Sequence, residues 1–126
     1  MKTCLIVDDS KIVRKVVRRI VEVFGFNILE AENGREAVDQ ARAHAVDVMI
    51  LDWNMPVMDG MECMKVIRAD ATISQPKIIF CTTENDFTKI QMAMTNGADE
   101  YVMKPFDEAI IAGKLVQLGI IEDGAQ

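Results

Sequence analysis

Residues 46 to 60 have the sequence VDVMILDWNMPVMDG, which joins a short apolar run to a polar turn. The run Val46–Leu51 predicts a strand that is buried on both faces, as parallel sheets require. Pro56 and Gly60 predict a rigid turn after it, because proline fixes φ and glycine tolerates positive φ. Asp52 therefore stands at the carboxyl end of a strand, where open α/β sheets bind ligands. Two interpretations are open: Asp52 is a functional carboxylate, or it only caps the turn.

A second predicted strand ends in two acids. The apolar run Cys4–Val7 is followed by Asp8, Asp9 and Ser10, and an amphipathic segment begins at Lys11. One of these acids could be the cap of a helix, since aspartate and serine are good N-cap residues. Two adjacent acids exceed what a cap needs.

The two acids would meet Asp52 if the first and third strands are neighbours. Two carboxylates ~4 Å apart repel each other by about 4 kcal/mol at an effective dielectric of about 20. A hard divalent cation offsets this repulsion, and Mg²⁺ is usually held by one or two carboxylates together with waters and phosphate oxygens. The acids therefore predict a Mg²⁺ site.

Two later strands also end in polar side chains. The apolar run Lys77–Cys81 precedes Thr82, and the run Glu100–Met103 precedes Lys104. A hydroxyl donor and an ammonium beside carboxylates suit a dianionic phosphoryl group, for which lysine acts as a compact point charge. The alternative for each residue is structural: Thr82 only ends its strand, and Lys104 only pairs with an acid.

Together these segments resemble a known family. The pattern of Asp8-Asp9, Asp52, Thr82 and Lys104-Pro105 is similar to the receiver domain of two-component response regulators, and residues 52 to 60 resemble CheY-like single-domain regulators in particular. The resemblance extends from about Lys2 to Leu118. It implies a phosphoacceptor at Asp52, with the phosphoryl oxygens bound by Thr82 and Lys104. It also implies Mg²⁺ held by Asp9, Asp52 and the backbone carbonyl of Asn54, with Asp8 assisting through water.

The resemblance further implies a switch. Thr82 would move toward the phosphoryl group and Tyr101 would swing inward, which would reshape the face made by residues 87–96, 100–103 and 107–118. Such a change is a population shift between two packings. The alternative for Tyr101 is an ordinary half-buried strand aromatic.

Access of water to the phosphorylated residue is expected to depend on its neighbours. Asn54 and Glu84 would flank the route of the attacking water, as in the family's chemotaxis regulator. Thr83 is bulkier than the alanine usual at its position and could hinder this access.

Length and composition agree with one domain. The chain has 126 residues, half of them hydrophobic, which can form a single core. We expect a receiver domain over residues 1–121 and a tail over 122–126. The net charge of −6 and the absence of a basic run argue against binding to nucleic acid.

Several other classes of site and location are not indicated. Cys4, Cys63 and Cys81 are odd in number and far apart, which favours neither a disulfide framework nor a zinc site. His44 is the only histidine and lies apart from the acids, so it is expected at the surface near a helix end. No signal peptide or membrane span is visible, and we expect a cytoplasmic monomer.

Strand and helix periods alternate along the chain, which predicts an α/β fold with a parallel sheet covered on both faces. Five strands and five helices are expected, and the resemblance implies a flavodoxin-like, CheY-like sheet with strand order 2-1-3-4-5. The first helix carries an apolar stripe made of Ile12, Val13, Val16, Val17, Ile20, Val21 and Phe24. A strand at Asn27–Ala31 follows. The other helices are expected at residues 34–43, after Gly60, at 87–96 with Ile90 and Met94 inward, and at 107–118.

These observations predict a phosphorylation-activated signalling switch. It would accept a phosphoryl group from a histidine kinase or phosphotransfer protein and act by contact with a target, at a flagellar motor or on another protein. It would catalyse its own phosphorylation and dephosphorylation but turn over no separate substrate. Two alternatives stay open: a phosphate sink without output, and a small Mg²⁺-dependent phosphohydrolase. The phosphohydrolase would need a second acid two residues after the nucleophile, where Asn54 stands.

Overall fold

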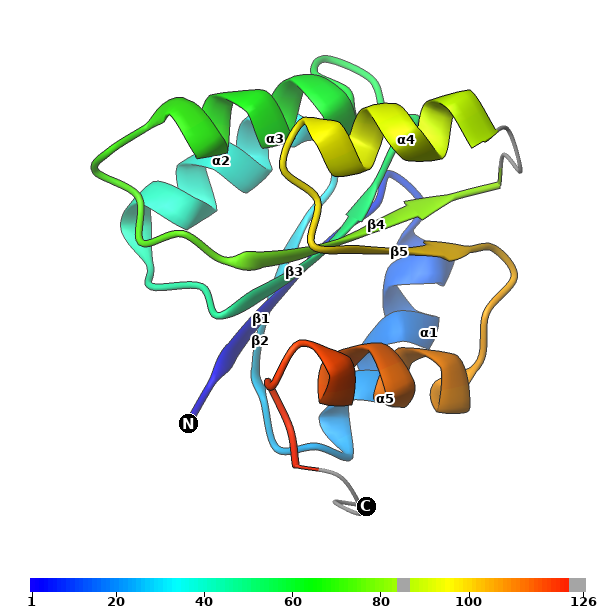
Figure 1. Ribbon diagram of the computed structural model, residues 1–126. Helices are drawn as coiled ribbons and strands as arrows, with labels where there is room; N and C mark the ends of the chain where they lie inside the picture. Colours follow the sequence, from blue (N-terminus) through cyan, green and yellow to red (C-terminus); the bar gives the residue numbers. More distant parts are fainter. Residues whose placement is uncertain (84–86, 123–126) are drawn as a thin grey trace.

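Strands and helices alternate in the computed structural model, which describes residues 1–83 and 87–122. All strands of these residues pair in parallel in one sheet of order β2-β1-β3-β4-β5 (Figure 1). The predicted fold class and strand order are therefore confirmed. The strands are β1 (Thr3–Val7), β2 (Asn27–Ala31), β3 (Val48–Asp52), β4 (Lys77–Thr82) and β5 (Glu100–Met103).

Helices cover both faces of the sheet. In Figure 1, α2, α3 and α4 lie above the sheet, and α1 and α5 lie below it. Most of them begin at a side-chain cap that accepts a hydrogen bond from the N–H group three residues later, which satisfies an otherwise unpaired donor. The helices are α1 (Lys11–Glu22), α2 (Gly34–Ala43), α3 (Gly60–Ala69), α4 (Phe87–Thr95) and α5 (Glu108–Gln117). The caps are Ser10 for α1, Asn33 for α2, Asp59 for α3 and Asp107 for α5.

The buried core has two parts, one on each face of the sheet. The first packs α2, α3 and α4 onto side chains such as Leu5, Met49 and Phe80. The second packs α1 and α5 onto Ile6, Ile50 and neighbouring side chains. Because both faces of the central strands are covered, these strands are apolar throughout, as the sequence of β3 indicated.

Strand register brings the first acids to Asp52. Val7 at the end of β1 is paired with Leu51 in β3, so Asp8 and Asp52 follow paired residues at the same edge of the sheet. On the other side of β3, Asp52 is paired with Cys81, the residue before Thr82. The carboxyl ends of the three central strands therefore meet.

The third strand starts later than predicted and ends one residue later. The N–H group of Asp47 donates to the carbonyl of Thr3, and the carboxylate of Asp47 accepts from the N–H group of Thr3. A side-chain oxygen thus replaces a main-chain acceptor, and regular pairing begins only at Val48. At the other end, the N–H group of Trp53 donates to the carbonyl of Cys81, so the ladder continues past Asp52.

The apolar stripe of α1 is only partly covered, and one predicted inward-facing side chain of α4 is exposed. Ile12 and Val16 of the stripe are 76% and 51% exposed, whereas Val17 and Val21 are buried. In α4, Ala93 is buried and Met94 is 40% exposed. In both helices the apolar residues are spread more widely around the axis than the face that the sheet covers.

The remaining expectations concern single side chains and the chain ends. His44 is exposed at the end of α2, as predicted, and the three cysteines are buried and unpaired. The ammonium of Lys2 donates to the carbonyl of Ile120 at 2.9 Å, which joins the segment before β1 to the segment after α5. Among the described residues, no helix is both long and apolar enough to cross a bilayer.

Candidate functional site

Three carboxylates gather at the carboxyl edge of the sheet. Asp8 and Asp52 are buried and Asp9 is exposed, and one oxygen of each lies within 4.8 Å of the others. Two hydrogen bonds to main-chain groups hold Asp8 in place. Its N–H group donates to the carbonyl of Ala31, and its side chain accepts from the N–H group of Ser10. The structure therefore brings together the acids that the sequence placed after two separate strands.

Lys104 lies between two of these acids. Its ammonium nitrogen is 2.6 Å from Oδ2 of Asp8 and 3.0 Å from Oδ1 of Asp52. The N–H group of Lys104 also donates to the carbonyl of Thr82, which fixes the backbone just after β5. One cation thus neutralises part of a cluster of three negative charges.

The pKa values of Asp52 and Lys104 are both raised, but for different reasons. Burial raises the pKa of Asp52, and the charges of Asp8 and Asp9 add to this, while the hydrogen bond from Lys104 opposes it without cancelling it. Burial alone would lower the pKa of Lys104, but its hydrogen bonds to the two acids outweigh burial, so its pKa is raised. The lysine therefore stays charged, and the site favours the arrival of further positive charge.

The residues present fit a hard divalent cation. The cluster offers carboxylate oxygens from three residues, which are the ligands that Mg²⁺ prefers, and one of the three, Asp9, is exposed. Asn54 is exposed in the loop after β3, two residues beyond Asp52. The acids Asp8, Asp9 and Asp52 are therefore candidate metal ligands.

The loop between β3 and α3 is held tightly against the site. The N–H group of Gly60 donates to the carbonyl of Trp53, and a methyl group added at Gly60 would lie 2.2 Å from the carbonyl oxygen of Asp52. A second glycine, Gly34 of α2, donates to the carbonyl of Met58. These close approaches require glycine and fix the backbone that carries Asp52.

The same loop contains a feature that the sequence analysis missed. Val57 has φ of +70°, in the left-handed region that side chains with a branched Cβ strongly disfavour. Its neighbours close a three-residue turn, in which the N–H group of Met58 donates to the carbonyl of Pro56 at 2.7 Å. Val57 is 79% exposed, so no burial compensates for this conformation.

The proposed switch residues occupy neighbouring strands. Thr82 is buried at the end of β4, and Tyr101 is half-buried in β5. The ammonium of Lys114 lies 5.6 Å from the centre of the Tyr101 ring and forms an ion pair of 2.9 Å with Glu100. No sequence pattern predicted this contact, because Lys114 reaches Tyr101 from a different element, α5.

Side chains on α4 and β5 differ in their exposure. Met92 of α4 is exposed, whereas Lys89 of α4 and Glu100 of β5 are half-buried. The ammonium of Lys89 lies 5.7 Å from the centre of the Trp53 ring, beside the candidate site. Glu84, which was expected to flank the site, lies outside the residues that the structure describes.

A family model matches most of the chain. The model described as the response regulator receiver domain matches residues 4–115. The chain therefore belongs to the response regulator receiver family, a class of phosphorylation-activated signalling switches that bind Mg²⁺ in an acidic pocket.

Several of the similar proteins in this family are chemotaxis regulators. The chemotaxis protein CheY1 of Helicobacter pylori is 36% identical over 113 residues, which cover 88% of this chain and 91% of that protein. The solved structure of the chemotaxis response regulator CheY4 of Vibrio cholerae has a TM-score of 0.86 at 34% identity, covering 94% of this chain and 98% of that chain. The CheX–CheY–BeF3–Mg²⁺ complex from Borrelia burgdorferi has a TM-score of 0.86 at 28% identity, covering 95% and 90%. The chain is thus a CheY-like receiver domain.

Proposed function

We propose that this chain is the switch of a two-component phosphorelay and that Asp52 is its phosphoacceptor. The observation that carries the proposal is the cluster of three carboxylates around one lysine, with Asp52 buried at its centre. A carboxylate is the nucleophile wherever an enzyme forms an aspartyl-phosphate. The acid cluster and the lysine together distinguish this site from a simple turn cap.

The donor we propose is the phosphohistidine of a histidine kinase or phosphotransfer protein. An oxygen of Asp52 attacks phosphorus, the bond between phosphorus and the imidazole nitrogen breaks, and its electron pair stays on that nitrogen. Phosphoryl transfer needs mainly alignment and charge stabilisation. Lys104 would exchange its bond to Asp52 for a bond to a phosphoryl oxygen, and the Thr82 hydroxyl would donate to another. Hydrolysis of the acyl phosphate by water would end the signal.

We assign Mg²⁺ to Asp9, Asp52 and the backbone carbonyl of Asn54, with Asp8 acting through water. When bound, the ion supplies positive charge that offsets repulsion between the acids and the incoming phosphoryl oxygens. The Borrelia burgdorferi CheY is described in a complex with BeF3 and Mg²⁺, which supports the same chemistry here. Asn54 also argues against a phosphohydrolase, because an amide cannot supply the second acid.

The output we propose is a contact with a target protein on the face formed by α4, β5 and α5. Thr82 would move toward the phosphoryl group, and Tyr101 would turn inward. Tyr101 is half-buried beneath Lys114 in this structure, so the ring has a defined starting position from which to move. Each of the three elements also carries an exposed apolar side chain: Met92, Met103 and Ile110.

The phosphoacceptor is tested by labelling with acetyl phosphate and with a phosphorylated kinase. Asp52→Asn is nearly isosteric and should keep the fold but accept no phosphoryl group. Asp59→Asn is the matched control, since Asp59 caps α3 outside the acid cluster, and it should be labelled normally. Undiminished labelling of the Asp52→Asn chain would refute the assignment.

The switch is tested by adding beryllofluoride and Mg²⁺ and measuring exposure of Tyr101 and affinity for a target. Tyr101→Ala should still be labelled at Asp52 but lose much of the gain in affinity, which is typically ~5- to 150-fold in coupled sites. If beryllofluoride changes neither Tyr101 nor binding of any target, the phosphate-sink function replaces the switch.

A further inference from the structure

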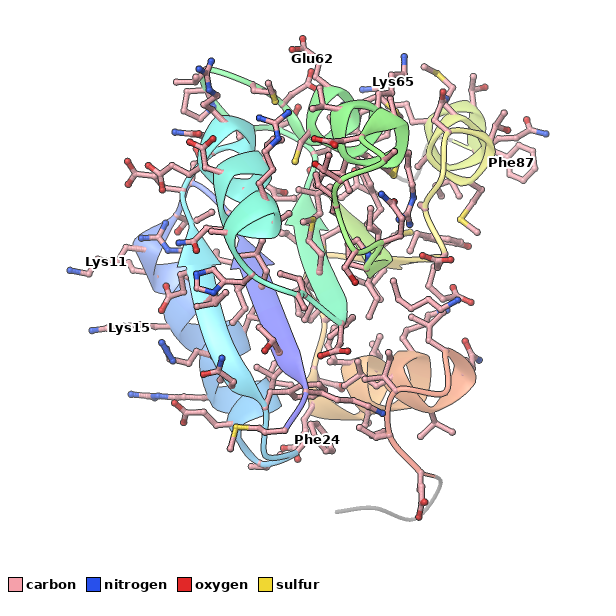
Figure 2. All side chains as sticks on the ribbon, turned by 90° about the vertical axis from the view of Figure 1, so that its left-hand side faces the viewer. Lys11, Lys15, Phe24, Glu62, Lys65 and Phe87 are labelled. Carbon is pink, nitrogen blue, oxygen red and sulfur yellow. The ribbon has the colours of Figure 1, made fainter. Side chains whose placement is uncertain are left out.

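One basic side chain of α1 is turned toward the candidate site. Lys11 and Lys15 extend from this helix away from the body of the protein (Figure 2). Arg14, in contrast, has only 14% of its side chain exposed, and its guanidinium donates to the carbonyl of Asp8 at 2.7 Å. Arg14 is therefore a largely covered cation that contacts the backbone of the acid cluster.

A second partner fixes the direction of the Arg14 guanidinium. Its Nε donates to Oε1 of Glu30 at 3.0 Å, while its Nη1 donates to the Asp8 carbonyl. The other oxygen of Glu30 accepts from Nε of Arg18, also at 3.0 Å. Burial alone would raise the pKa of Glu30, but the two arginines outweigh burial and lower this pKa, so the carboxylate stays charged. Because a guanidinium is planar and rigid, a carboxylate bound at one N–H group sets where the others point.

The end of β2 holds the backbone of Asp8 from two directions. The carbonyl of Ala31 accepts from the N–H group of Asp8 at 3.1 Å. The side chain of Glu30, the residue before Ala31, orients the guanidinium that binds the Asp8 carbonyl. That carbonyl belongs to the peptide unit that joins Asp8 to Asp9. Since a peptide unit is planar, fixing its carbonyl oxygen fixes the direction in which the chain enters Asp9.

The side chain of Asp9 has no other support. It is exposed, and no hydrogen bond or ion pair joins it to any residue that the structure describes. The carboxylate of Asp8, in contrast, is held by the N–H group of Ser10 and the ammonium of Lys104. The same ammonium holds Asp52. The position of the third candidate ligand therefore depends on the backbone that carries it.

We infer that Arg14 is a positioning residue of the candidate metal site, which holds Asp9 where its carboxylate meets the other two acids. The inference deepens the proposed function and rests on it, because it takes these acids as ligands of Mg²⁺. The ion binds only those molecules in which the ligand is in place, so the apparent Kd rises as their fraction falls. Arg14 keeps this fraction high through the backbone, without being a ligand itself.

Two other roles for Arg14 predict different results. If Arg14 acted only through its charge, its removal would strengthen Mg²⁺ binding, because a cation beside the carboxylates repels an incoming ion. If Arg14 only joined α1 to β2, its removal would lower the free energy of unfolding but leave the affinity of the folded protein for Mg²⁺ unchanged. Positioning is the role for which removal weakens Mg²⁺ binding while the protein stays folded.

The test measures the Kd for Mg²⁺ of the full chain from the fluorescence of Trp53, its only tryptophan. Arg14→Met keeps an apolar stem but has neither charge nor donor. It should raise this Kd about tenfold, since loss of a residue that orients a metal ligand costs ~10- to 100-fold in affinity. Arg14→Lys keeps the charge but not the planar fork, so it should also raise the Kd. The rate of labelling by acetyl phosphate should need more Mg²⁺ in both variants, but the rate at saturating Mg²⁺ should stay that of the wild type.

Two substitutions in the same helix are matched controls. Arg18→Met breaks the other bond to Glu30, which has the same length of 3.0 Å, but Arg18 forms no hydrogen bond with Asp8. Lys15→Met removes the same charge from a side chain that extends away from the body of the protein (Figure 2). Both should bind Mg²⁺ with the Kd of the wild type. Urea unfolding in a chelator shows which variants are folded.

The remaining outcomes separate this inference from the function on which it rests. An unchanged or lower Kd in folded Arg14→Met would overturn the inference. An equal rise in Arg18→Met would also overturn it, because the effect would then come from the packing of α1 on β2. If Arg14→Met does not fold, Arg14→Lys decides in its place, and a wild-type Kd in that variant overturns the inference. Failure of the wild type to bind Mg²⁺ would instead refute the metal site itself.

Discussion

At the scale of single residues, the candidate site contains three carboxylates and one neighbouring lysine, so negative charge is in excess. Lys104 bonds to Asp8 and Asp52, while Asp9 has no such bond to it and raises the pKa of Asp52 through its charge. Removing one negative charge should therefore stabilise the protein when no metal is present. The effect should reverse when Mg²⁺ is supplied.

Asp9→Asn is predicted to stabilise the metal-free protein by roughly 1 kcal/mol at neutral pH, because it removes repulsion between nearby carboxylates. In the wild type, the pKa of Asp52 is higher in the folded than in the unfolded state, so protonation of Asp52 stabilises the fold. This stabilisation is complete at a pH below the pKa of the unfolded state and is lost as the pH rises through the pKa of the folded state. The raised pKa of Lys104 has a separate effect, since its stabilisation is lost only in alkali. Urea unfolding of the wild type and of Asp9→Asn in a chelator, from pH 3 to 8, measures the two free energies of unfolding.

The same unfolding experiment in Mg²⁺ is the control for this prediction. The wild type should gain stability from the ion, and Asp9→Asn should gain much less because a ligand is missing. A variant that is less stable than the wild type in chelator would contradict the repulsion among these acids.

A second residue-scale prediction concerns Val57 in its left-handed conformation. Asn adopts this conformation more readily than a β-branched residue, so Val57→Asn should stabilise the protein by about 1 kcal/mol. Nothing is lost from the core, since Val57 is exposed. Val23→Asn is the matched control at an exposed position with φ of −64°, and it should change stability by less than about 0.5 kcal/mol in urea unfolding. Equal effects of the two substitutions would exclude relief of strain.

At the scale of elements, the start of α3 and the end of β3 are in direct contact. Gly60→Ala should destabilise the protein by about 2 kcal/mol, because the new methyl group would overlap the carbonyl oxygen of Asp52 and force the two elements apart. It should also weaken Mg²⁺ binding by displacing Asp52. Gly113→Ala in α5 meets open space and should stabilise by about 0.5 to 1 kcal/mol through helix propensity. Thermal unfolding of both variants with and without Mg²⁺ tests this contrast.

The sequence predicted strands and helices better than it predicted other features of the structure. The alternation of apolar periods located the strands and helices, and glycine and capping residues marked their ends to within a few residues. Periodicity could not supply the strand order, which came from the resemblance to a family. It also could not show that Ile12 and Val16 are exposed, since a helix stripe shows which residues are apolar but not how much of the helix its neighbours cover.

The candidate site was predictable in part for a similar reason. Acids at the ends of adjacent parallel strands lie near one another, so the positions of Asp8, Asp9 and Asp52 predicted a cluster once the family resemblance had placed β1 beside β3. The contacts of Lys89 with Trp53 and of Lys114 with Tyr101 depend on how helices pack across the sheet, which no local pattern records. The positive φ of Val57 is set by the closure of its loop and not by its own preference.

At the scale of the whole molecule, the only tryptophan can serve as a fluorescent reporter of the candidate site. Trp53 adjoins Asp52, packs edge-on against Phe80 with ring centres 5.0 Å apart, and lies beneath Lys89 of α4. Millimolar Mg²⁺ should change its fluorescence and raise the melting temperature, since binding to the native state stabilises by ~2.7 kcal/mol at a hundredfold excess over Kd.

Asp52→Asn should weaken both responses to Mg²⁺, whereas Asp107→Asn, at the cap of α5, should leave them as in the wild type. If added Mg²⁺ changes neither the fluorescence nor the melting temperature of the wild type, the acids do not bind this ion.

The bond from Lys2 to Ile120 places the segment before β1 beside the segment after α5, at the amino edge of the sheet and opposite the acids. A flexible linker could therefore join these two segments, and new termini could be opened between His44 and Ala45, an exposed pair before β3. In such a circular permutant, the order of strands in space stays the same while the first and third strands change their order along the polypeptide. The acids would then be assembled from a rearranged chain, so this receiver offers a scaffold in which connectivity can be engineered separately from the chemistry.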